Sequence, residues 1–234
     1  MFQLGAFFPK IDTSARLNGT GGRIGTQLNF ESELGMSDSK TTGTFLAGVR
    51  LGERWRIEAE YFTLGRDGSR PISRTINWGN QTFAVNSVVG SSFDTDIYRL
   101  SGGYSFVKDN QKEFGVALGL HATDIAASIG VGGVGAQSGD VLAPLPTIGI
   151  YGAYAFSPRW LLSGRVDYFS LSSGDYDGSL VNLTAGLDYR FTRNFGMGVG
   201  WRYVDYDVTV TKSRYNGGIT YKFNGPTLYA TLSF

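Results

Sequence analysis

The sequence contains no cysteine and only one histidine, His121, among its 234 residues. Without cysteine the chain forms no disulfide and no thiolate metal site, and one histidine excludes a multi-histidine metal centre within a single chain. We therefore predict no metal site and no bound cofactor. Three pairs of aspartates are interpreted as solvated strand ends, with calcium binding as the alternative: Asp94/Asp96, Asp175/Asp177 and Asp205/Asp207.

Charge is also scarce, since charged residues make up 18% of the chain, compared with about 25% in ordinary soluble domains. The net charge of +1 gives no reason to expect nucleic acid as a partner. The uncharged stretch of residues 125–139 consists largely of glycine and other small residues. A membrane-spanning helix requires about 20 apolar residues, so a bundle of such helices is excluded.

Glycine and aromatic residues are abundant instead, with 34 glycines and 14% aromatic residues. The dominant pattern is an alternation of apolar with polar or small side chains, which is typical of β-strands with two different faces. No stretch of comparable length has a helical period. The clearest alternating segments are residues 55–62, 181–191, 195–204 and 227–234.

Short turns alternate with much longer connections along the chain. The predicted short turns are residues 52–54, 108–111, 157–159 and 192–194. An up-and-down transmembrane barrel has this arrangement, with tight periplasmic turns and larger extracellular loops. Four short turns and two termini on one side give ten antiparallel strands in one all-β domain, residues 1–234, with eight or twelve strands as alternatives.

The register of three strand pairs follows from the rule that facing residues share a side of the sheet. In the hairpin that joins residues 55–61 to residues 98–104, a turn at Gly79 and Asn80 makes the numbers of each pair of facing residues add up to 159. The predicted pairs are Trp55 with Tyr104, Trp160 with Tyr189, and Phe195 with Leu232. One topology then serves the whole chain.

Aromatic residues on the apolar face flank the short turns. They form a predicted girdle of Trp55, Tyr104, Phe106, Phe114, Phe156, Trp160, Tyr189, Phe191 and Phe195. A second group lies further along the strands: Phe8, Phe45, Tyr61, Tyr98, Tyr168, Trp201 and Tyr203. Two girdles that bound an apolar band are expected at two membrane interfaces, so the apolar face is predicted to meet lipid.

The polar face then lines the lumen. It carries a predicted charge network of Arg50, Arg56, Glu58, Glu60, Arg99, His121, Arg165, Asp167, Asp188, Arg190 and Arg202. Both signs of charge are present, so these groups can neutralise one another in a narrow interior.

The chain resembles Gram-negative outer-membrane β-barrels over its whole length. Its last residues include Leu228, Ala230, Leu232 and the terminal Phe234, which resemble the signal read by the outer-membrane assembly machinery. Residues 17–36 and 54–62 are similar to segments of the small OmpA-like and OmpW-like barrels, which have eight strands. The resemblance implies a location in the bacterial outer membrane, among its lipids and lipopolysaccharide. Residues 1–5 have no basic segment followed by an apolar core, so we expect a signal peptide to have been removed.

The long hairpin at about residues 66–92 is the most unusual predicted feature. Its outer part, residues 69–89, keeps strand-type side chains, among them Trp78 and Phe83. As exposed apolar groups these two would bind a partner. Alternatively, the hairpin packs over the barrel mouth or on other loops.

His121 is predicted on the inward face near the extracellular rim, with Ile97 or Arg99 as its neighbour. Enzymatic barrels, such as those resembling omptin proteases or lipid A acyl-modifying enzymes, place a histidine beside Ser, Asp or Glu at this rim. We interpret His121 as a hydrogen-bonded lumen residue and predict a non-catalytic barrel. Its loops would interact with lipopolysaccharide or a protein partner. The alternatives are a narrow passive channel and a His121-dependent hydrolase or acyltransferase.

Overall fold

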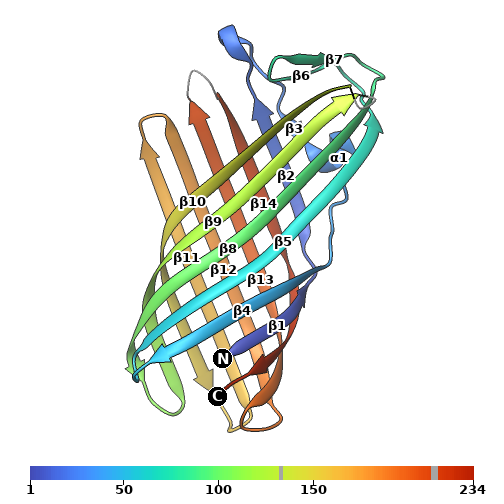
Figure 1. Cartoon of the computed structure of the whole chain (residues 1–234). Helices are drawn as coiled ribbons and strands as arrows, with labels where there is room; N and C mark the ends of the chain where they lie inside the picture. Colours follow the sequence, from blue (N-terminus) through green and yellow to red (C-terminus); the bar gives the residue numbers. More distant parts are fainter. Residues whose placement is uncertain (132–133, 212–215) are drawn as a thin grey trace.

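The structure is a computed structural model that describes residues 1–131, 134–211 and 216–234. Strands dominate it (Figure 1). The elements are β1 (Phe2–Phe7), β2 (Lys10–Leu17), η1 (Thr20–Gly22), β3 (Leu28–Asn29), α1 (Phe30–Leu34), β4 (Thr42–Leu51), β5 (Trp55–Pro71), β6 (Ile76–Trp78), β7 (Gln81–Phe83), β8 (Val88–Lys108), β9 (Lys112–Val131), β10 (Val134–Ala155), β11 (Trp160–Ser173), β12 (Tyr176–Arg190), β13 (Phe195–Thr211) and β14 (Asn216–Leu232). Among the described residues, no helix has the length and apolar character needed to cross a membrane.

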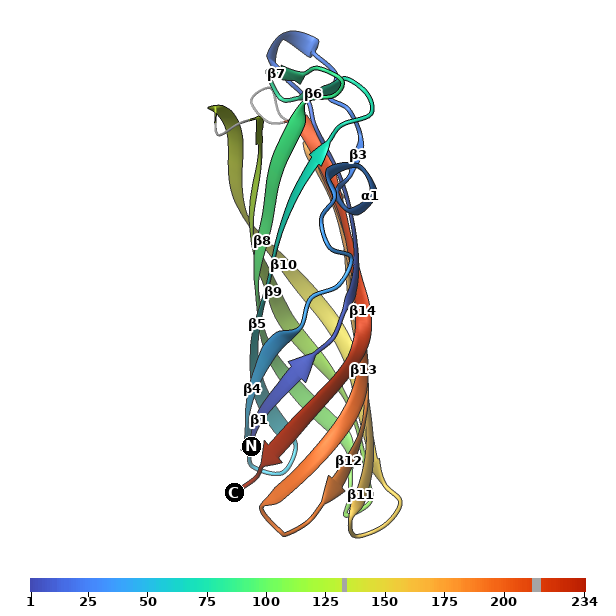
Figure 2. The ribbon, with the colours of Figure 1, turned by 90° about the vertical axis from the view of Figure 1, so that its right-hand side faces the viewer.

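Within the described ranges, ten antiparallel strands form a closed ring in the order β1–β4–β5–β8–β9–β10–β11–β12–β13–β14, and β1 pairs with β14. Strand β2 continues along β14 after β1 ends. The short turns and both termini gather at one end, and the long connections lie at the other (Figures 1 and 2). The predicted ten-stranded up-and-down barrel is therefore confirmed.

The three predicted registers are also confirmed. Trp55 faces Tyr104 in the β5–β8 ladder, and this register continues to the pair of Pro71 with Val88. The other two ladders pair Trp160 with Tyr189 and Phe195 with Leu232. The turn positions set these pairings, and alternation supports them because a slip of one residue would turn every apolar side chain of a strand inward.

The outer surface between the two girdles is apolar. Most of the predicted girdle around the short turns is exposed, for example Trp55, Phe106 and Phe191. At the other girdle, Phe45, Tyr61, Tyr98, Tyr168 and Trp201 are exposed as well. We call the part of the wall between the girdles the membrane barrel. The strands and connections beyond the outer girdle, which is the one away from the short turns, are called the head.

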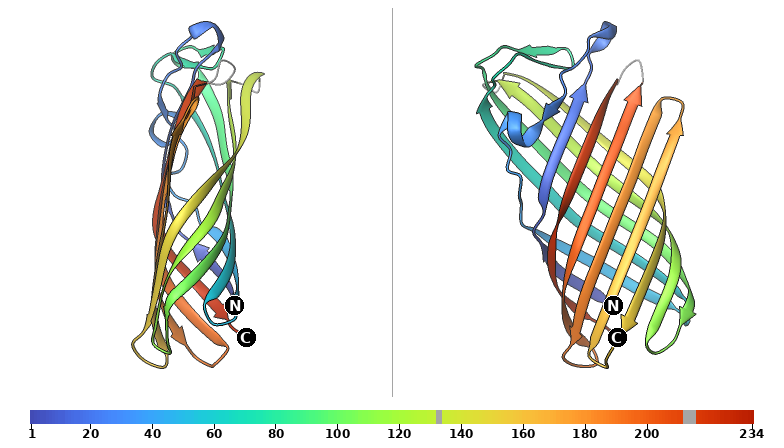
Figure 3. Two further views of the ribbon diagram at one scale, coloured as in Figure 1. Left: turned by 90° about the vertical axis from the view of Figure 1, so that its left-hand side faces the viewer. Right: turned by 180° about the vertical axis from the view of Figure 1, so that it is seen from behind.

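The ladder between β10 and β11 stops at the outer girdle. Its last pair is Ile148 with Tyr168, and Pro146 and Pro144 follow in β10. Alternate residues of a strand direct their backbone groups to the same neighbour. The ladder with β9 runs past both prolines, so the missing N–H donors are those on the β11 side. Proline thus ends the pairing, and the two sheets part in the head (Figure 3).

A second seam in the head lies between β2 and β5. Strand β4 starts at Thr42 and its ladder with β5 begins at the pair of Thr44 with Phe62. The segment from residue 18 to residue 41, which includes α1, fills this seam (Figure 2). Glu31 of α1 accepts hydrogen bonds from the Thr13 backbone N–H of β2 and from the Arg66 guanidinium of β5. Helix α1 therefore joins the two edges through a side chain.

Candidate functional site

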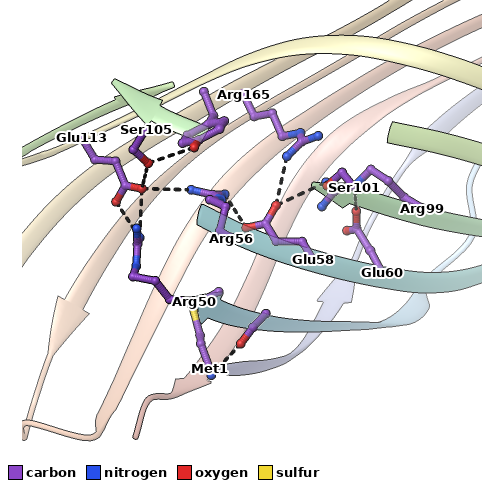
Figure 4. Close-up of polar contacts among 12 residues, drawn as sticks. Met1, Arg50, Arg56, Glu58, Glu60, Arg99, Ser101, Ser105, Glu113 and Arg165 are labelled. Atoms are coloured by element: carbon purple, nitrogen blue, oxygen red, sulfur yellow. Dashed lines mark hydrogen bonds and ion pairs between the residues drawn. The ribbon is translucent and has the colours of Figure 1, made fainter. Parts of the chain in front are cut away.

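The lumen of the membrane barrel holds two groups of charged side chains. The group near the short turns centres on Glu113, which pairs with Arg50 Nη2 at 2.8 Å and with Lys108 Nζ at 3.1 Å. The Ser105 hydroxyl donates to Glu113 Oε1 at 2.6 Å, and Tyr151 lies 2.9 Å from Ser105 Oγ (Figure 4). Every oxygen of this buried carboxylate thus has a partner.

The deeper group contains three arginines and three carboxylates among the described residues. Glu58 pairs with Arg165 at 3.0 Å and with Arg99 at 3.4 Å, and it also pairs with Arg56 (Figure 4). Glu60 accepts from Arg99 Nε at 2.9 Å and from Arg202. Asp167 pairs with Arg165 at 2.6 Å.

These contacts come from four different strands, since Glu58 and Glu60 lie on β5, Arg99 on β8, Arg165 and Asp167 on β11 and Arg202 on β13. The ion pairs therefore cross the lumen from wall to wall. The three deep arginines balance Glu58, Glu60 and Asp167 in charge, which is the condition for holding such groups away from water.

Small residues make this packing possible. A Cβ added to Gly115 would collide with the hydroxyl oxygen of Tyr151. A Cβ added to Gly198 would lie 2.5 Å from the Tyr229 ring. Glycine on the inward face therefore gives the two tyrosines room to cross the lumen.

His121 lies deep in the lumen and not at an open rim. Its side chain is 4% exposed, and Arg99 faces it in the β8–β9 ladder as one of the two predicted neighbours. Its Nε2 lies 3.8 Å from Asp167 Oδ2. That carboxylate already accepts from Arg165 and from Asn182 Nδ2 at 3.1 Å. Asp167 is thus held mainly by other groups.

The remaining residues of the predicted network lie nearer the short turns. Asp188 accepts from the Tyr229 hydroxyl at 3.3 Å, and Arg190 is exposed at the rim. Sequence reasoning missed Glu113, Ser105 and Tyr151. The signal for Glu113 was available, because the residue before the outward-facing Phe114 must point into the lumen.

Two cavities flank the deep ion pairs. A vestibule of about 170 Å³ lies on the side of Met1 and Gln3 and reaches Glu60, Arg99 and Arg202. The same three side chains also line a cavity of about 10 Å³ next to His121 and Tyr206, which has room for about one water molecule. The ion pairs of Glu60 therefore form a partition between the two spaces.

An apolar core fills the head beyond this partition. Phe7, Phe62 and Phe223 pack edge to face with ring centroids 5.9–6.1 Å apart. Further out, Phe93 packs against Tyr221 at 5.2 Å and against Phe30 of α1 at 5.5 Å. The two sheets of the head thus meet through aromatic side chains and α1.

The connections at the end of the head fold onto each other as a cap, which we define as residues 18–41 and 72–87. Thr26 and Asn77 exchange hydrogen bonds between the two segments at 2.7 and 2.9 Å. Arg74 pairs with Glu33 at 2.6 Å, and the Thr20 N–H donates to Asn80 at 2.8 Å. The cap is therefore an ordered unit built from both connections.

The expectation that Trp78 and Phe83 are exposed is wrong, since each is 6% exposed. Trp78 packs against Phe30 at 5.9 Å between ring centroids. The alternative, in which the hairpin packs on other loops, describes the structure. Residues 69–71 and 88–89 also belong to the wall, because they pair in the β5–β8 ladder. In the part of the chain that the structure describes, β6 and β7 form a separate two-stranded sheet.

The last strand meets the first in the ring. Leu228, Ala230 and Leu232 face Ala6, Leu4 and Phe2 of β1, and Phe234 packs edge to face with Phe2 at 6.1 Å. For the acidic pairs, the described residues contain no group of three or more His, Cys, Asp or Glu side chains arranged to hold a metal ion.

Comparison with known proteins bears on the fold. No family model matches the sequence, and no curated protein matches it. The outer membrane protease OmpT from Escherichia coli is similar in structure, with a TM-score of 0.57 at 11% identity over 99% of this chain and 96% of that chain. The translocator domain of the autotransporter NalP from Neisseria meningitidis gives 0.43 at 12% identity, covering 100% and 88%. Neisserial surface protein A gives 0.34 at 14% identity, covering 99% and 97%.

The likeness to OmpT shows the fold, and the apolar outer surface with two aromatic girdles agrees with it. The chain is a β-barrel of the outer-membrane type, as its sequence predicted.

Proposed function

We propose that the protein is a non-conducting, non-catalytic barrel of the bacterial outer membrane whose head interacts with partners at the cell surface. The filled lumen is the observation that carries this proposal. A solute entering from the short-turn end meets the partition of Glu60, Arg99 and Arg202. Behind it lies the aromatic core around Phe7 and Phe223. Two successive obstructions of different chemistry oppose passage of ions and of apolar solutes alike.

Conductance in a planar bilayer tests the closed lumen. The purified barrel should give no steady open steps, while a porin reconstituted in the same bilayer should give them. Steady steps from this chain would favour the narrow passive channel. Folded barrel is identified by a difference in gel migration between unboiled and boiled samples. Protein without this difference is unfolded and is left out of the comparison.

The geometry around His121 argues against catalysis. Its imidazole is buried, and the cavity beside it has room for about one water molecule. A general base must reach the proton that it removes, and neither a peptide nor a lipid fits that space. OmpT is a protease, so peptide cleavage is the activity to test here, together with a change in lipid A mass. We expect neither activity from the wild type nor any difference in the His121→Ala variant.

Interaction with lipopolysaccharide or with a protein is assigned to the head, because the cap presents exposed side chains on an ordered support. Ile24 is 73% exposed, and Val85 of the cap and the adjoining Val88, the first residue of β8, are also exposed. Co-purification from the native membrane should yield a specific companion. Its recovery should fall when these three residues are replaced by Ser, and should persist in a Glu53→Ser variant altered at the opposite end. Equal recovery of the companion from both variants would show that the cap does not bind it.

A further inference from the structure

The short-turn end of the barrel carries an excess of positive charge. Residues 50–56, 104–114, 156–160 and 188–195 contain eight Lys or Arg and four Asp or Glu. This end therefore has a surplus of four positive charges, although the whole chain has a net charge of +1. The rest of the chain must carry a surplus of three negative charges.

Two of the four carboxylates at this end, Glu113 and Asp188, are turned inward. Glu113 lies in the lumen among Arg50, Arg56 and Lys108, and Asp188 is held by Tyr229. Asp109 accepts from the backbone N–H groups of Gln111 and Lys112, which lower the pKa of its carboxyl group. Glu113 and Asp188 therefore do little to neutralise the outer surface, whereas the exposed carboxylates of Asp109 and Glu53 keep their negative charge there.

Five cations at this end are left facing the surroundings. All five are exposed, and none forms an ion pair among the residues that the structure describes. They are Arg54, Lys112, Arg159, Arg190 and Arg193. Two exposed carboxylates, Glu53 and Asp109, oppose these five cations, so the anions that balance the remaining positive charge come from outside the protein.

Each of these cations lies beside the aromatic girdle. Arg54 precedes Trp55, Arg159 precedes Trp160, and Arg190 lies between Tyr189 and Phe191. The Arg159 Nη1 donates to the Tyr189 hydroxyl at 3.1 Å. Girdle aromatics lie at the level of the lipid headgroups, so the guanidinium and ammonium groups lie at the depth of the phosphates.

The cations are also spread around the circumference. Three of the four short turns contain one, and Lys112 directly follows the fourth; the turns close the same end of the ring (Figure 1). A docked protein would need its cations gathered on one side, whereas a shell of lipid surrounds the barrel. The distribution therefore favours lipid.

We propose that the short-turn end of the membrane barrel binds the headgroups of anionic phospholipids, such as phosphatidylglycerol, in the inner leaflet of the outer membrane. The proposal rests on the membrane location within the proposed function, but not on the closed lumen or on a surface partner. Each Lys or Arg near an anionic surface strengthens the attraction to that surface about fivefold at physiological ionic strength. The attraction acts within a screening length of about 8 Å.

Quenching of tryptophan fluorescence by brominated lipids tests this binding. The full chain carries four tryptophans, and a Trp201→Phe background leaves Trp55 and Trp160 as the two in the girdle beside the cations. The barrel is reconstituted in phosphatidylcholine vesicles that contain either dibrominated phosphatidylglycerol or dibrominated phosphatidylcholine. We expect phosphatidylglycerol to be enriched at the girdle by about three- to tenfold. At about 1 M salt, where screening acts over about 3 Å, the enrichment should fall towards one.

Two variants with the same change in net charge locate the site. Lys112→Gln/Arg159→Gln/Arg193→Gln removes one cation in or beside each of three turns and should abolish most of the enrichment. Lys10→Gln/Arg16→Gln/Lys40→Gln changes exposed residues of the head and should retain it. Equal quenching by the two brominated lipids in the wild type, or an equal loss in both variants, would overturn the proposal. A heat-modifiable barrel without lipid preference would still leave the proposed function standing.

Discussion

Replacing Glu60 with Leu should destabilise the barrel more than replacing Glu60 and Arg202 together. Among the described residues, Glu60 is the only carboxylate paired with Arg202, whereas Arg99 keeps Glu58 at 3.4 Å. Glu60→Leu therefore leaves one guanidinium buried and unpaired. Removing one partner of a buried ion pair costs about 3–5 kcal/mol. We expect about 3 kcal/mol, because the vestibule brings water to this side of the partition.

The double variant Glu60→Leu/Arg202→Leu leaves no orphaned charge. It loses the contact of the Arg202 guanidinium with the Phe62 ring, 4.8 Å from the centroid, which is worth about 0.5–2 kcal/mol. The two new leucines replace that contact with apolar packing beside Phe62 and Val204, which line the same small cavity. We therefore expect a stability within about 1 kcal/mol of the wild type.

Unfolding in urea from lipid vesicles measures both free energies. Glu53→Gln, in an exposed turn, is the control and should lie within about 0.5 kcal/mol of the wild type. A double variant as unstable as Glu60→Leu alone would contradict this expectation, because the loss of stability would then come from lost attraction and not from an unpaired charge. Conductance should stay absent in both variants, since the core around Phe7 and Phe223 still closes the head.

Three further predictions concern the lipid-facing and lumen-facing sides of the membrane barrel and the stability of the head. Leu183→Arg places a charge on the lipid side of β12 and should lower the free energy of unfolding in urea by about 2–4 kcal/mol. Thr184→Arg, whose side chain points into the lumen, should lower it less. A larger loss for Thr184→Arg would show that the two faces of the strand are assigned the wrong way round. Replacing residues 72–87 by a short Gly/Ser linker removes the buried Ile76, Trp78 and Phe83. The head should then become sensitive to protease, while the membrane barrel stays heat-modifiable. Failure of this variant to assemble would show that the wall needs the cap. Burial raises the pKa of Tyr206 to about 12 and also raises the pKa of Tyr221, so both hydroxyls are neutral in the folded head. Their contribution to the stability of the head is complete below the unfolded pKa of about 10. It is lost as the pH rises towards 12. Protease sensitivity of the head should therefore increase over this alkaline range in the wild type and less in Tyr206→Phe, and a pH-independent head would contradict this.

The membrane barrel could be predicted because its signals are local. Each strand shows its alternation within about ten residues, and the turn residues set the register of neighbours such as Trp55 and Tyr104. Inward-facing arginines and carboxylates were identified by parity alone. Their partners were not, because Arg165 and Glu58 lie 107 positions apart in the sequence and meet only across the lumen.

The head was harder to predict because its contacts join separate connections. Trp78 and Phe83 have the same local sequence whether the hairpin stands free or folds back on residues 18–41. Burial is decided by Phe30, which reaches Trp78 from α1, and a five-residue helix has no detectable period. Pro144 and Pro146, in contrast, were a visible sign that a ladder ends in β10.

The two seams of the head bear on how the wall meets the bilayer. In hydrocarbon an open strand edge leaves N–H and C=O groups without partners, whereas above the bilayer water hydrates them. Both seams begin at the outer girdle, beside Tyr168 and beside Phe62. The β10–β11 ladder keeps eight pairs below its seam, close to the roughly 9–11 residues that cross the hydrocarbon. The length of the closed part of the wall thus matches the thickness of the hydrocarbon layer. A sequence change that moved Pro146 along β10 would shift the depth at which the protein lies in the membrane.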